Sequence, residues 1–535
     1  MNQITDKKTV LYISNDTTMG GAIQSLIDML FFMERFIIPI VVIPCNAQLE
    51  SVLKREGILY YIVPISRGYG IIGQHTAEDE AEDFLINHRA AIRIKEIIHN
   101  HNVSLVHINS SVSNAGAMAA ILAGVPYVWH LREIPEQQFG CEFWDKELKQ
   151  IFFKAADGFI AISECVKDDY KEKYGIDSFK LYNIIDSKRY KAEILRKPEN
   201  KYNILLAGVI SEAKGQLDAI KAVKLLVDMG YENIKLYLVG SFDKRFEWCF
   251  AKYVKKNSLE QNIVLEPHVD DLSEIRKKCA ISLTTSRYEA LGRGTIEAML
   301  AGNIVIGADT GETPQLVGKN GERGYLYTMG DPVSLADTII KVLDDEDNHR
   351  ELLIRAQNYA ETMFAGIPYA ETLNAYYDKI LDEKKETLFK ENARSFITQR
   401  YEELAVKQIA SNSKPNVNKG NKIKELNSMW EAGTVATYLK QHNITKVVIY
   451  GMGELGRRLY DELTESGIQI EAVMDKNSFC LTEVVEVYKP DENLVSAEYI
   501  ISTVVSDFNE VKSAFPKKKV IDLVKLVMQI SCCIK

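Results

Sequence analysis

Two carboxylate side chains stand eight positions apart on either side of a glycine loop, and the elements around them suggest a site where carboxylates could accept hydrogen bonds from a ligand. They are Glu289 and Glu297, and the loop between them contains Gly292 and Gly294. A strand-like run precedes the first carboxylate, a short helix-forming run begins near the second, and another strand-like run follows. The order is strand, glycine loop, helix, strand.

This order of elements suits a diphosphate. The N–H groups at a helix start are unpaired and carry partial positive charge, so a loop that enters a helix can hold an anion. Glycines let the backbone approach such a ligand closely. With a helix start expected at Thr295, Glu297 lies in the first turn, where it would accept hydrogen bonds from two sugar hydroxyls. Glu289 lies nearer the reacting end. The alternative is a helix start with ordinary surface carboxylates, and the surrounding elements favour function.

A second glycine pattern lies near the C-terminus. A strand-like run at 446–450 leads directly into Gly451, Gly453 and Gly456, and a second strand ends at Asp475. This is the layout of a dinucleotide-binding βαβ unit, in which the acid meets a ribose. We expect these residues to bind NAD or another nucleotide, and a purely structural use of the fold remains the alternative.

The elements that must position these residues alternate between strand and helix. The alternation fills the first half of the chain and restarts at 202–207, after a charged, polar stretch at 191–200 that we interpret as a linker. Alternating strands and helices predict parallel sheets with helices on both faces, and such sheets bind ligands at the carboxyl ends of their strands. We therefore expect an α/β protein built from Rossmann-like domains.

Composition narrows the classes of protein. A chain of 535 residues exceeds the usual single domain. The net charge of −9 argues against a nucleic-acid binder. No apolar stretch is long enough to span a bilayer, and the first residues lack a signal-peptide core. Eight scattered cysteines without a C-x-x-C pair indicate a reduced, cytoplasmic setting without a structural metal site.

Further segments extend the first pattern. They are 159–167, 182–186, 206–216 and 305–317. As an ordered set with 286–302, they resemble the retaining family-4 glycosyltransferases of the GT-B fold. The resemblance covers about residues 8 to 382 of the sequence.

The resemblance implies two Rossmann-like domains that face a cleft. An acceptor-side domain would occupy 1–190 and a donor-binding domain 191–385, the latter with a helix that returns to the first domain. A helical and polar linker at 386–429 and a small Rossmann-like domain at 430–535 would complete the chain.

The resemblance also implies which residues would contact the diphosphate and the nucleotide. Lys214, in the loop that begins at Gly208, would neutralise the leaving diphosphate. Backbone amides near Leu291 and Gly292 would face the phosphates. Glu297 would bind the ribose hydroxyls. Glu289 would contact hydroxyls of the transferred sugar and stabilise positive charge near its anomeric carbon.

Three positions depart from the family pattern. Val209 stands where an arginine usually follows the glycine, and we expect Arg293 to compensate. In the second glycine turn, beside Thr313, Glu312 replaces a glycine and Gln315 replaces a glutamate. The donor sugar is therefore less predictable than nucleotide binding.

On the acceptor side, Gly20 and Gly21 would form a loop at the cleft edge. His107 and His130 each close a strand-like run, and His130 better matches the family's cleft histidine, so we take His130 as catalytic. A structural histidine is the alternative. Arg132, two positions after His130, could form a surface ion pair with the adjacent Glu133.

The leading hypothesis is a retaining, metal-independent glycosyltransferase. It would move a sugar from a UDP- or GDP-sugar to a glycan or lipid-linked acceptor in surface polysaccharide biosynthesis, without a cofactor. We expect a cytoplasmic protein that can work at the inner face of the membrane by peripheral contact. A sugar-nucleotide epimerase of the same fold and a non-catalytic scaffold that binds nucleotide sugars are the alternatives.

Overall fold

The computed structural model describes most of the chain. The described residues are 7–15, 20–45, 48–194, 200–269, 271–345, 349–383, 387–411, 430, 434–475, 487–488, 496–504 and 508–533. By their contacts the residues form two compact units. The first comprises Met1–Gly208, Ala213–Val239 and Val264–Asn412, and the second comprises Val209–Glu212, Gly240–Ile263 and Ser413–Lys535. The polar linker predicted after residue 411 lies outside the described residues.

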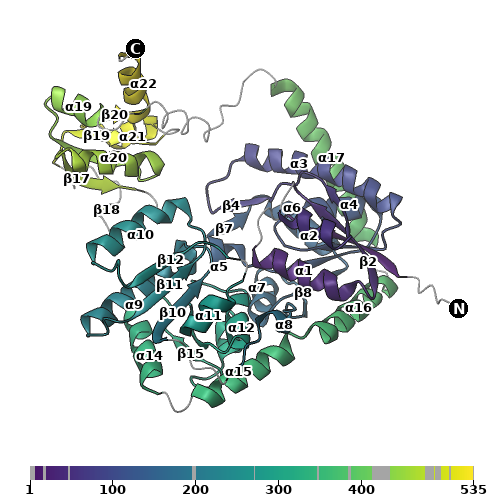
Figure 1. The fold of residues 1–535 in the computed structure, drawn as a ribbon. Coiled ribbons are helices and arrows are strands. Elements are labelled where there is room, and N and C mark those ends of the chain that lie inside the picture. The colour runs from purple at the N-terminus through teal and green to yellow at the C-terminus, as the bar shows by residue number, and fades with distance from the viewer. Residues whose placement is uncertain are drawn as a thin grey trace. The chain divides into compact units, whose positions relative to one another are not determined.

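Seven parallel strands form the sheet of the first lobe, the name used here for described residues 7–190 (Figure 1). Their order is β3-β2-β1-β5-β6-β8-β9. The bounds are β1 Lys8–Ile13, β2 Ile37–Ile43, β3 Leu59–Ile62, β5 Leu105–Ile108, β6 Tyr127–Leu131, β8 Gly158–Ala161 and β9 Phe179–Lys180. A small antiparallel pair, β4 (Tyr69–Ile71) and β7 (Cys141–Phe143), was not predicted from the sequence.

Helices connect these strands. They are α1 Gly21–Met33, α2 Gln48–Arg55, α3 Ala77–Asn100, α4 Ala115–Ala123, α5 Pro135–Phe139, α6 Lys146–Ala155, α7 Glu164–Tyr174 and α8 Ser187–Tyr190. Polar side chains fix several helix starts, because Thr76, Asp145 and Ser163 each accept a hydrogen bond from a backbone N–H in the first turn.

Six strands form the sheet of the second lobe, the name used here for the residues between 200 and 363 that belong to the first unit. Their order is β12-β11-β10-β13-β14-β15. The bounds are β10 Asn200–Ala207, β11 Lys235–Val239, β12 Ile263–Glu266, β13 Cys279–Thr284, β14 Ile304–Ala308 and β15 Tyr325–Tyr327. The intervening elements are the 3-10 turn η1 Glu212–Lys214 and helices α9 Gln216–Asp228, α11 Ser273–Lys278, α12 Arg293–Leu300, α13 Thr313–Val317, α14 Pro332–Asp344 and α15 His349–Met363.

Two long helices close the first unit. Helix α16 (Gly366–Asp382) leaves the second lobe and packs with α1 on the first sheet, through residues that include Tyr369 and Tyr377 (Figure 1). Helix α17 (Thr387–Ser411) packs Ala393 and Ile397 into the core on the other face of that sheet. The returning helix that the family resemblance implied is therefore present.

The second unit contains a five-stranded parallel sheet of order β18-β17-β16-β19-β20. The bounds are β16 Lys446–Tyr450, β17 Gln469–Met474, β18 Val487–Tyr488, β19 Tyr499–Ser502 and β20 Lys519–Asp522, with helices α19 Thr434–Gln441, α20 Glu454–Glu465, α21 Phe508–Ala514 and α22 Leu523–Cys533. Helix α10 (Lys244–Lys256) belongs to the same unit, and the indole N–H of Trp248 donates to Asp461 on α20 at 2.9 Å. The expected α/β class with parallel sheets is confirmed.

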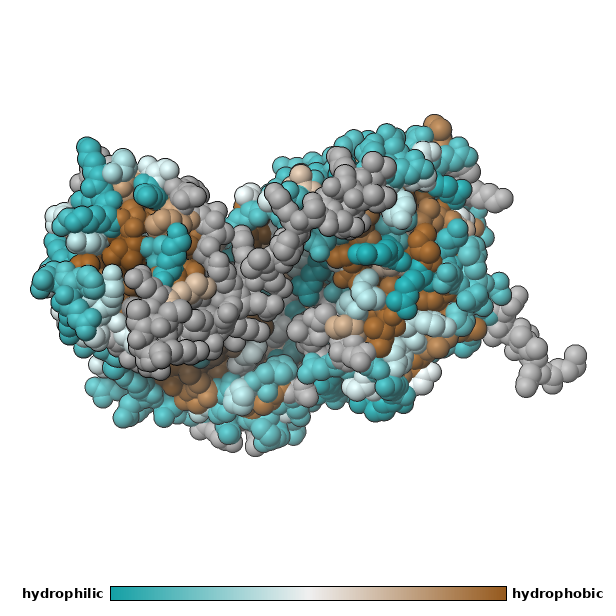
Figure 2. Space-filling model, turned by 90° about the horizontal axis from the view of Figure 1, so that it is seen from above, coloured by the Kyte–Doolittle hydropathy of each residue, from teal (hydrophilic) through white to brown (hydrophobic). Residues whose placement is uncertain are grey.

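Apolar residues on the surface are dispersed. On the face shown in Figure 2, hydrophilic side chains predominate and apolar ones form separate patches. Phe31 on α1 is 65% exposed, whereas the ring of Phe32 packs against Gly366. Within the described part of the chain, no helix combines the length and apolarity needed to cross a bilayer.

Candidate functional site

Lys214 and Glu289 meet at the carboxyl edge of the second sheet. Nζ of Lys214 lies 2.6 Å from Oε1 of Glu289, and the hydroxyl of Ser286 donates to the same oxygen. Lys214 ends the turn η1 after β10, and Glu289 lies in the loop after β13. Because β10 and β13 are neighbours, the loops that leave their carboxyl ends come together. The fold thus joins an ammonium and a carboxylate that are 75 positions apart.

A glycine makes this approach possible. Gly215 has φ +67°, and a Cβ atom there would overlap the carbonyl oxygen of Thr285. The hydroxyl of Thr285 also donates to the carbonyl oxygen of Lys214 at 2.8 Å. The backbone beside Lys214 is therefore held against the loop that carries Glu289.

Glu297 lies deeper in its helix than the sequence predicted. Helix α12 begins at Arg293 rather than at Thr295, because Gly292 takes φ 83° and ends the loop earlier. The first turn of α12 therefore contains no acidic residue. The Glu297 carboxylate pairs with Arg276 at 3.1 Å and with Arg293 at 3.2 Å. Two guanidinium groups orient this carboxylate.

Arg293 also joins the two lobes. Its guanidinium pairs with Asp28 on α1 at 2.8 Å and donates to the hydroxyl of Ser25 at 3.2 Å. Burial lowers the pKa of Arg293, but the nearby carboxylates of Asp28 and Glu297 outweigh this effect and leave the pKa above its usual value. Gly21, at the start of α1, faces the aliphatic part of the Arg293 side chain. The N-terminal ends of α1 and α12 thus meet at one arginine.

The other predicted donor-side residues surround this point. Gly208 has φ +139° and open space beside its Cα atom. Gly294 is exposed with open space beside it, so the start of α12 is accessible to a ligand. Leu291 is buried instead. Thr313 is also buried, and its hydroxyl has no hydrogen-bond partner among the described residues.

The predicted first-lobe residues divide into exposed and buried groups. Gly20 and Gly21 are exposed at the start of α1. His130 lies inside β6 rather than after it, and its side chain is fully buried. Arg132 is buried as well, so it is not the surface ion pair considered from the sequence. It donates to Asn109 at 3.0 Å and to Asn183 at 2.6 Å.

Sequence reasoning missed the carboxylate and guanidinium groups that hold the site together. Asp28 and Arg276 lie on helices without any motif, and only the fold places them beside Arg293 and Glu297. Glu312 was read as a departure from the family pattern, but its buried carboxylate accepts hydrogen bonds from the Tyr182 hydroxyl and the Cys165 backbone N–H. The sequence offered one feature that could have indicated these contacts, which was a charged residue at a position where the family usually has a glycine.

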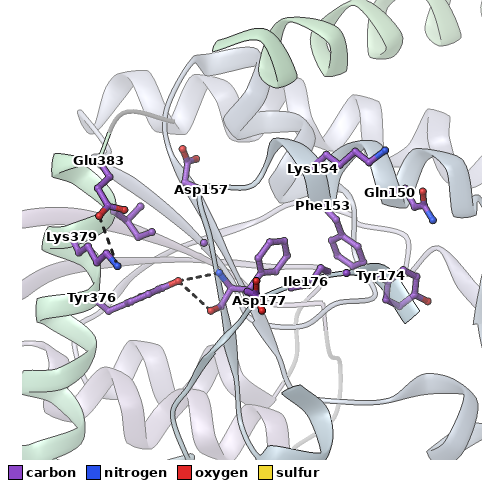
Figure 3. A pocket seen from close by; sticks show the side chains of 14 residues that line it. Gln150, Phe153, Lys154, Asp157, Tyr174, Ile176, Asp177, Tyr376, Lys379 and Glu383 are labelled. Carbon is purple, nitrogen blue, oxygen red and sulfur yellow. Dashed lines mark hydrogen bonds and ion pairs between the residues drawn. The ribbon is translucent and has the colours of Figure 1, made fainter. Parts of the chain in front are cut away.

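A pocket of about 360 Å³ lies elsewhere on the first unit (Figure 3). Gly158 opens β8, so this pocket lies at the amino end of that strand, whereas His130 and the loops of the predicted site belong to the carboxyl edge. The hydroxyl of Tyr376 donates to the carbonyl oxygen of Phe159 at 3.2 Å, and Figure 3 shows Lys379 paired with Glu383. The pocket therefore does not coincide with the predicted site.

The glycine pattern of the second unit adopts a tight strand-to-helix turn. Gly451 has φ +95°, and a Cβ atom on Gly456 would overlap the Gly451 carbonyl oxygen, so the helix approaches the strand closely. Gly453 precedes α20 with open space beside it. The Asp475 carboxylate, at the end of β17, accepts a hydrogen bond from the Met452 N–H at 2.5 Å. These residues fit the outline of a nucleotide-binding turn.

The site in the first unit has the chemical groups for transfer from a diphosphate leaving group. The ammonium of Lys214 and the N-terminal end of α12, which begins at Arg293, can balance developing negative charge. Glu289 and Glu297 offer carboxylate oxygens to hydroxyl groups. Arg293 adds a cation between the lobes.

Two family models match the chain. "Glycosyl transferases group 1" matches residues 187–362, the range that contains Lys214, Glu289 and Glu297. "Glycosyltransferase Family 4" matches residues 71–189, the range that contains His130.

Curated relatives carry similar names. The chain is 25% identical over 312 residues to an N-acetyl-alpha-D-glucosaminyl L-malate synthase of Bacillus anthracis. The aligned region covers 55% of this chain and 80% of the relative. It is 26% identical over 314 residues to the capsular polysaccharide biosynthesis glycosyltransferase CapM of Staphylococcus aureus, covering 55% and 81%.

Solved structures share the fold. Anabaena Alr3699/HepE, in complex with UDP and glucose, superposes with a TM-score of 0.56 at 20% identity, covering 69% of this chain and 99% of that chain. A variant of S. aureus TarM, in complex with Fondaparinux, alpha-GlcNAc-glycerol and UDP, gives 0.55 at 12% identity, covering 69% and 100%. With the two family models and the motifs around Glu289, these likenesses show that the chain is a family-4 glycosyltransferase with the GT-B fold.

Proposed function

We propose that the protein transfers a sugar, with retention of anomeric configuration, from a nucleoside diphosphate sugar to a glycan or lipid-linked acceptor. UDP-sugars are the favoured donors, because solved structures of similar fold are described with UDP or UDP-glucose. Synthesis of a surface polysaccharide is the favoured setting, because relatives are named for capsule and polyol-phosphate modification.

One observation carries the proposal: Lys214 and Glu289 meet at 2.6 Å at the carboxyl edge of the second sheet, where the loop that holds Glu289 leads into helix α12, which carries Glu297. A leaving diphosphate at the helix start would lie near the Lys214 ammonium. Glu297, one turn into the helix, would accept hydrogen bonds from the ribose. Glu289 would face the transferred sugar. Positive side chains and the helix dipole would then take the place of a metal ion.

The test is a panel of UDP- and GDP-sugars, incubated with the protein and with oligosaccharide, polyol-phosphate or lipid-linked acceptors. Release of UDP or GDP identifies the donor, and the anomeric coupling constant in the product's NMR spectrum reports retention or inversion. Substitution Glu297→Ala should abolish nucleotide binding and transfer. Glu274→Ala, which removes an exposed carboxylate paired with Lys277, is the matched control. Binding and transfer that survive Glu297→Ala would contradict the proposal.

For the second unit we propose a nucleotide site at the turn 451–456. The strand order β18-β17-β16-β19-β20 and the open space beside Gly453 support it. Titration of the full chain with NAD, after the Glu297 site has been saturated with UDP, should show a further binding event. Gly453→Val should remove that event by filling the space where phosphates would approach, while leaving the UDP binding that depends on Glu297. Absence of any binding event with NAD would count against this site.

A further inference from the structure

The pocket at the amino end of β8 lies where three helices end. Helix α6 ends at Ala155, α7 at Tyr174 and α16 at Asp382, and residues from the last turns of all three line this cavity of about 360 Å³ (Figure 3). Helix ends present carbonyl groups without an intrahelical partner and carry partial negative charge. The volume is at the lower end of the range for pockets that hold small molecules. The cavity therefore suits one small ligand that donates hydrogen bonds.

The returning helix α16 forms one wall of the pocket and holds a tyrosine ring in place there. Gly158 allows the close approach, because a Cβ atom at that position would overlap the Tyr376 hydroxyl. This hydroxyl accepts from the Phe159 N–H at 3.1 Å and donates to the Phe159 carbonyl oxygen at 3.2 Å. One face of the Tyr376 ring stacks on Phe179, with the ring centroids 4.9 Å apart and the planes 11° from parallel. The ring is thus fixed, and only its other face can meet a ligand.

Other aromatic side chains line the pocket beside Tyr376. Phe153 and Phe159 pack edge to face at 5.7 Å between ring centroids, and Tyr174 packs on Phe153 at 5.4 Å. Because these rings support one another, they offer apolar surface without losing much freedom when a ligand binds. A sugar ring has apolar faces made of C–H groups, which pack well on aromatic rings, and hydroxyl groups around its edge.

The charged groups of the pocket nearly cancel. Carboxylates and ammonium groups both line it, and they belong to Asp157, Asp177, Glu383, Lys154 and Lys379. Lys390 on α17 pairs with Asp157 at 2.7 Å, and Lys379 lies 3.8 Å from Glu383. Such a balance favours neither a phosphate nor a free cation. Carboxylates accept hydrogen bonds from hydroxyl groups and ammonium groups donate to them, so the lining suits a neutral ligand with many hydroxyls.

We infer that this pocket binds a neutral sugar unit of the acceptor glycan, at a distance from the unit that reacts. The inference rests on the proposed function, in which the acceptor is a glycan. Strand β8 has four residues, so roughly 13 Å of strand separates the pocket from the carboxyl edge of the same sheet. Only an acceptor of several units can occupy the pocket and the carboxyl edge together. Binding at the pocket raises the effective concentration of the reacting end, so the protein would prefer long acceptors to short ones.

The first experiment needs no sugar donor. The full chain, labelled with a fluorophore, is applied to an array that carries neutral glycans and poly(glycerol phosphate). Wild type should bind a subset of the neutral glycans. Tyr376→Leu, which removes the ring but keeps an apolar side chain, should weaken this binding by about 10-fold. Glu297→Ala should leave it unchanged, because Glu297 belongs to the donor side.

Tyr376→Phe is the matched control. It keeps the ring face but loses the hydroxyl that bonds the backbone of Phe159, so it should bind glycans like wild type. Equal weakening in Tyr376→Leu and Tyr376→Phe would show that the residue acts only on the structure. That result, the absence of neutral-glycan binding, or a preference for poly(glycerol phosphate) would overturn the inference.

The second experiment uses the donor and the acceptor found in the sugar panel, with acceptors of increasing length. In wild type, KM for the acceptor should fall as the acceptor grows. Tyr376→Leu should raise KM for the long acceptor by about 10-fold and leave kcat, and KM for the shortest acceptor, unchanged. A wild-type KM that does not depend on length, or an equal rise for the shortest acceptor, would overturn the inference. If no donor is turned over, the proposed function fails, while the array still decides whether the pocket binds glycans.

Discussion

The Glu312 carboxylate in the second lobe accepts a hydrogen bond from the hydroxyl of Tyr182 in the first lobe at 2.8 Å. Its other oxygen accepts from the backbone N–H of Cys165 at 3.2 Å, in the first turn of α7. A carboxylate at a helix start is favoured by the helix dipole. Burial raises the pKa of Tyr182, and the nearby Glu312 carboxylate raises it further. The phenol therefore stays protonated and can donate. The departure from the family pattern at this position thus links the lobes.

Substitution Glu312→Gly, which restores the residue usual in the family, should destabilise the protein. The Tyr182 hydroxyl and the Cys165 N–H would both lose an acceptor in a buried place, at a cost of about 1–3 kcal/mol for each unsatisfied group. A lower melting temperature, followed by circular dichroism, is the expected result.

Two controls accompany this measurement. Tyr182→Phe removes one partner and should lower the melting temperature by less. Gln315→Glu restores the other family residue at an exposed position and should leave the melting temperature unchanged. An unchanged melting temperature in Glu312→Gly would show that the link between the lobes contributes nothing.

Lys214→Met should remove the positive charge proposed for the leaving diphosphate. We expect kcat to fall by about 10²–10³-fold, the range found when one group that stabilises transition-state charge is deleted. Lys214→Arg should keep more activity, because it retains the charge beside Glu289. The measurement is steady-state release of the nucleoside diphosphate.

Lys224→Met tests whether this effect is specific. Lys224 lies on α9 in the same lobe and is also ion-paired, to Asp228, but no proposed substrate contact involves it. Equal kcat values for Lys214→Met and Lys224→Met would remove Lys214 from the site.

The sequence predicted the parallel sheets better than it predicted the boundaries of α12. Strand and helix periodicity depends on local residue types, so β10, β13 and β14 could be found directly. The start of α12 depends on the conformation of Gly292, which nothing in the local pattern specifies. The helix therefore begins two residues early, and Glu297 moves out of the first turn.

Long-range contacts could not be predicted from the sequence, for a different reason. Tyr377 bonds His107 across 270 positions, and Arg293 contacts Ser25 across 268. Neither contact has a local motif, because each depends on how α16 and α12 pack against the first lobe. His130 was chosen because it closes a strand-like run and matches the family's cleft histidine, but its burial and its partners became visible only in the fold.

Lys149 provides a prediction about pH and stability. This lysine is fully buried among the rings of Trp129, Phe143 and Phe153, and its ammonium donates to the Ser111 carbonyl oxygen at 2.6 Å. Burial lowers its pKa to about 7, although the negative charge of Asp83 raises it in part. The unfolded chain would titrate this group near 10.5.

Between these two pKa values the unfolded chain binds more protons at Lys149 than the folded protein does, so this residue makes stability rise with pH from about 7 to about 10.5. Below pH 7 both states carry the charge, and the cost of burying it is present in full. Lys149→Met removes the titration. The melting temperature of the variant minus that of wild type should therefore fall steadily as pH rises from about 7 to 10. Lys154→Met, at an exposed position on the same helix, should give a difference that does not change with pH. A pH-independent difference for Lys149→Met would mean that this lysine has an ordinary pKa in the folded protein.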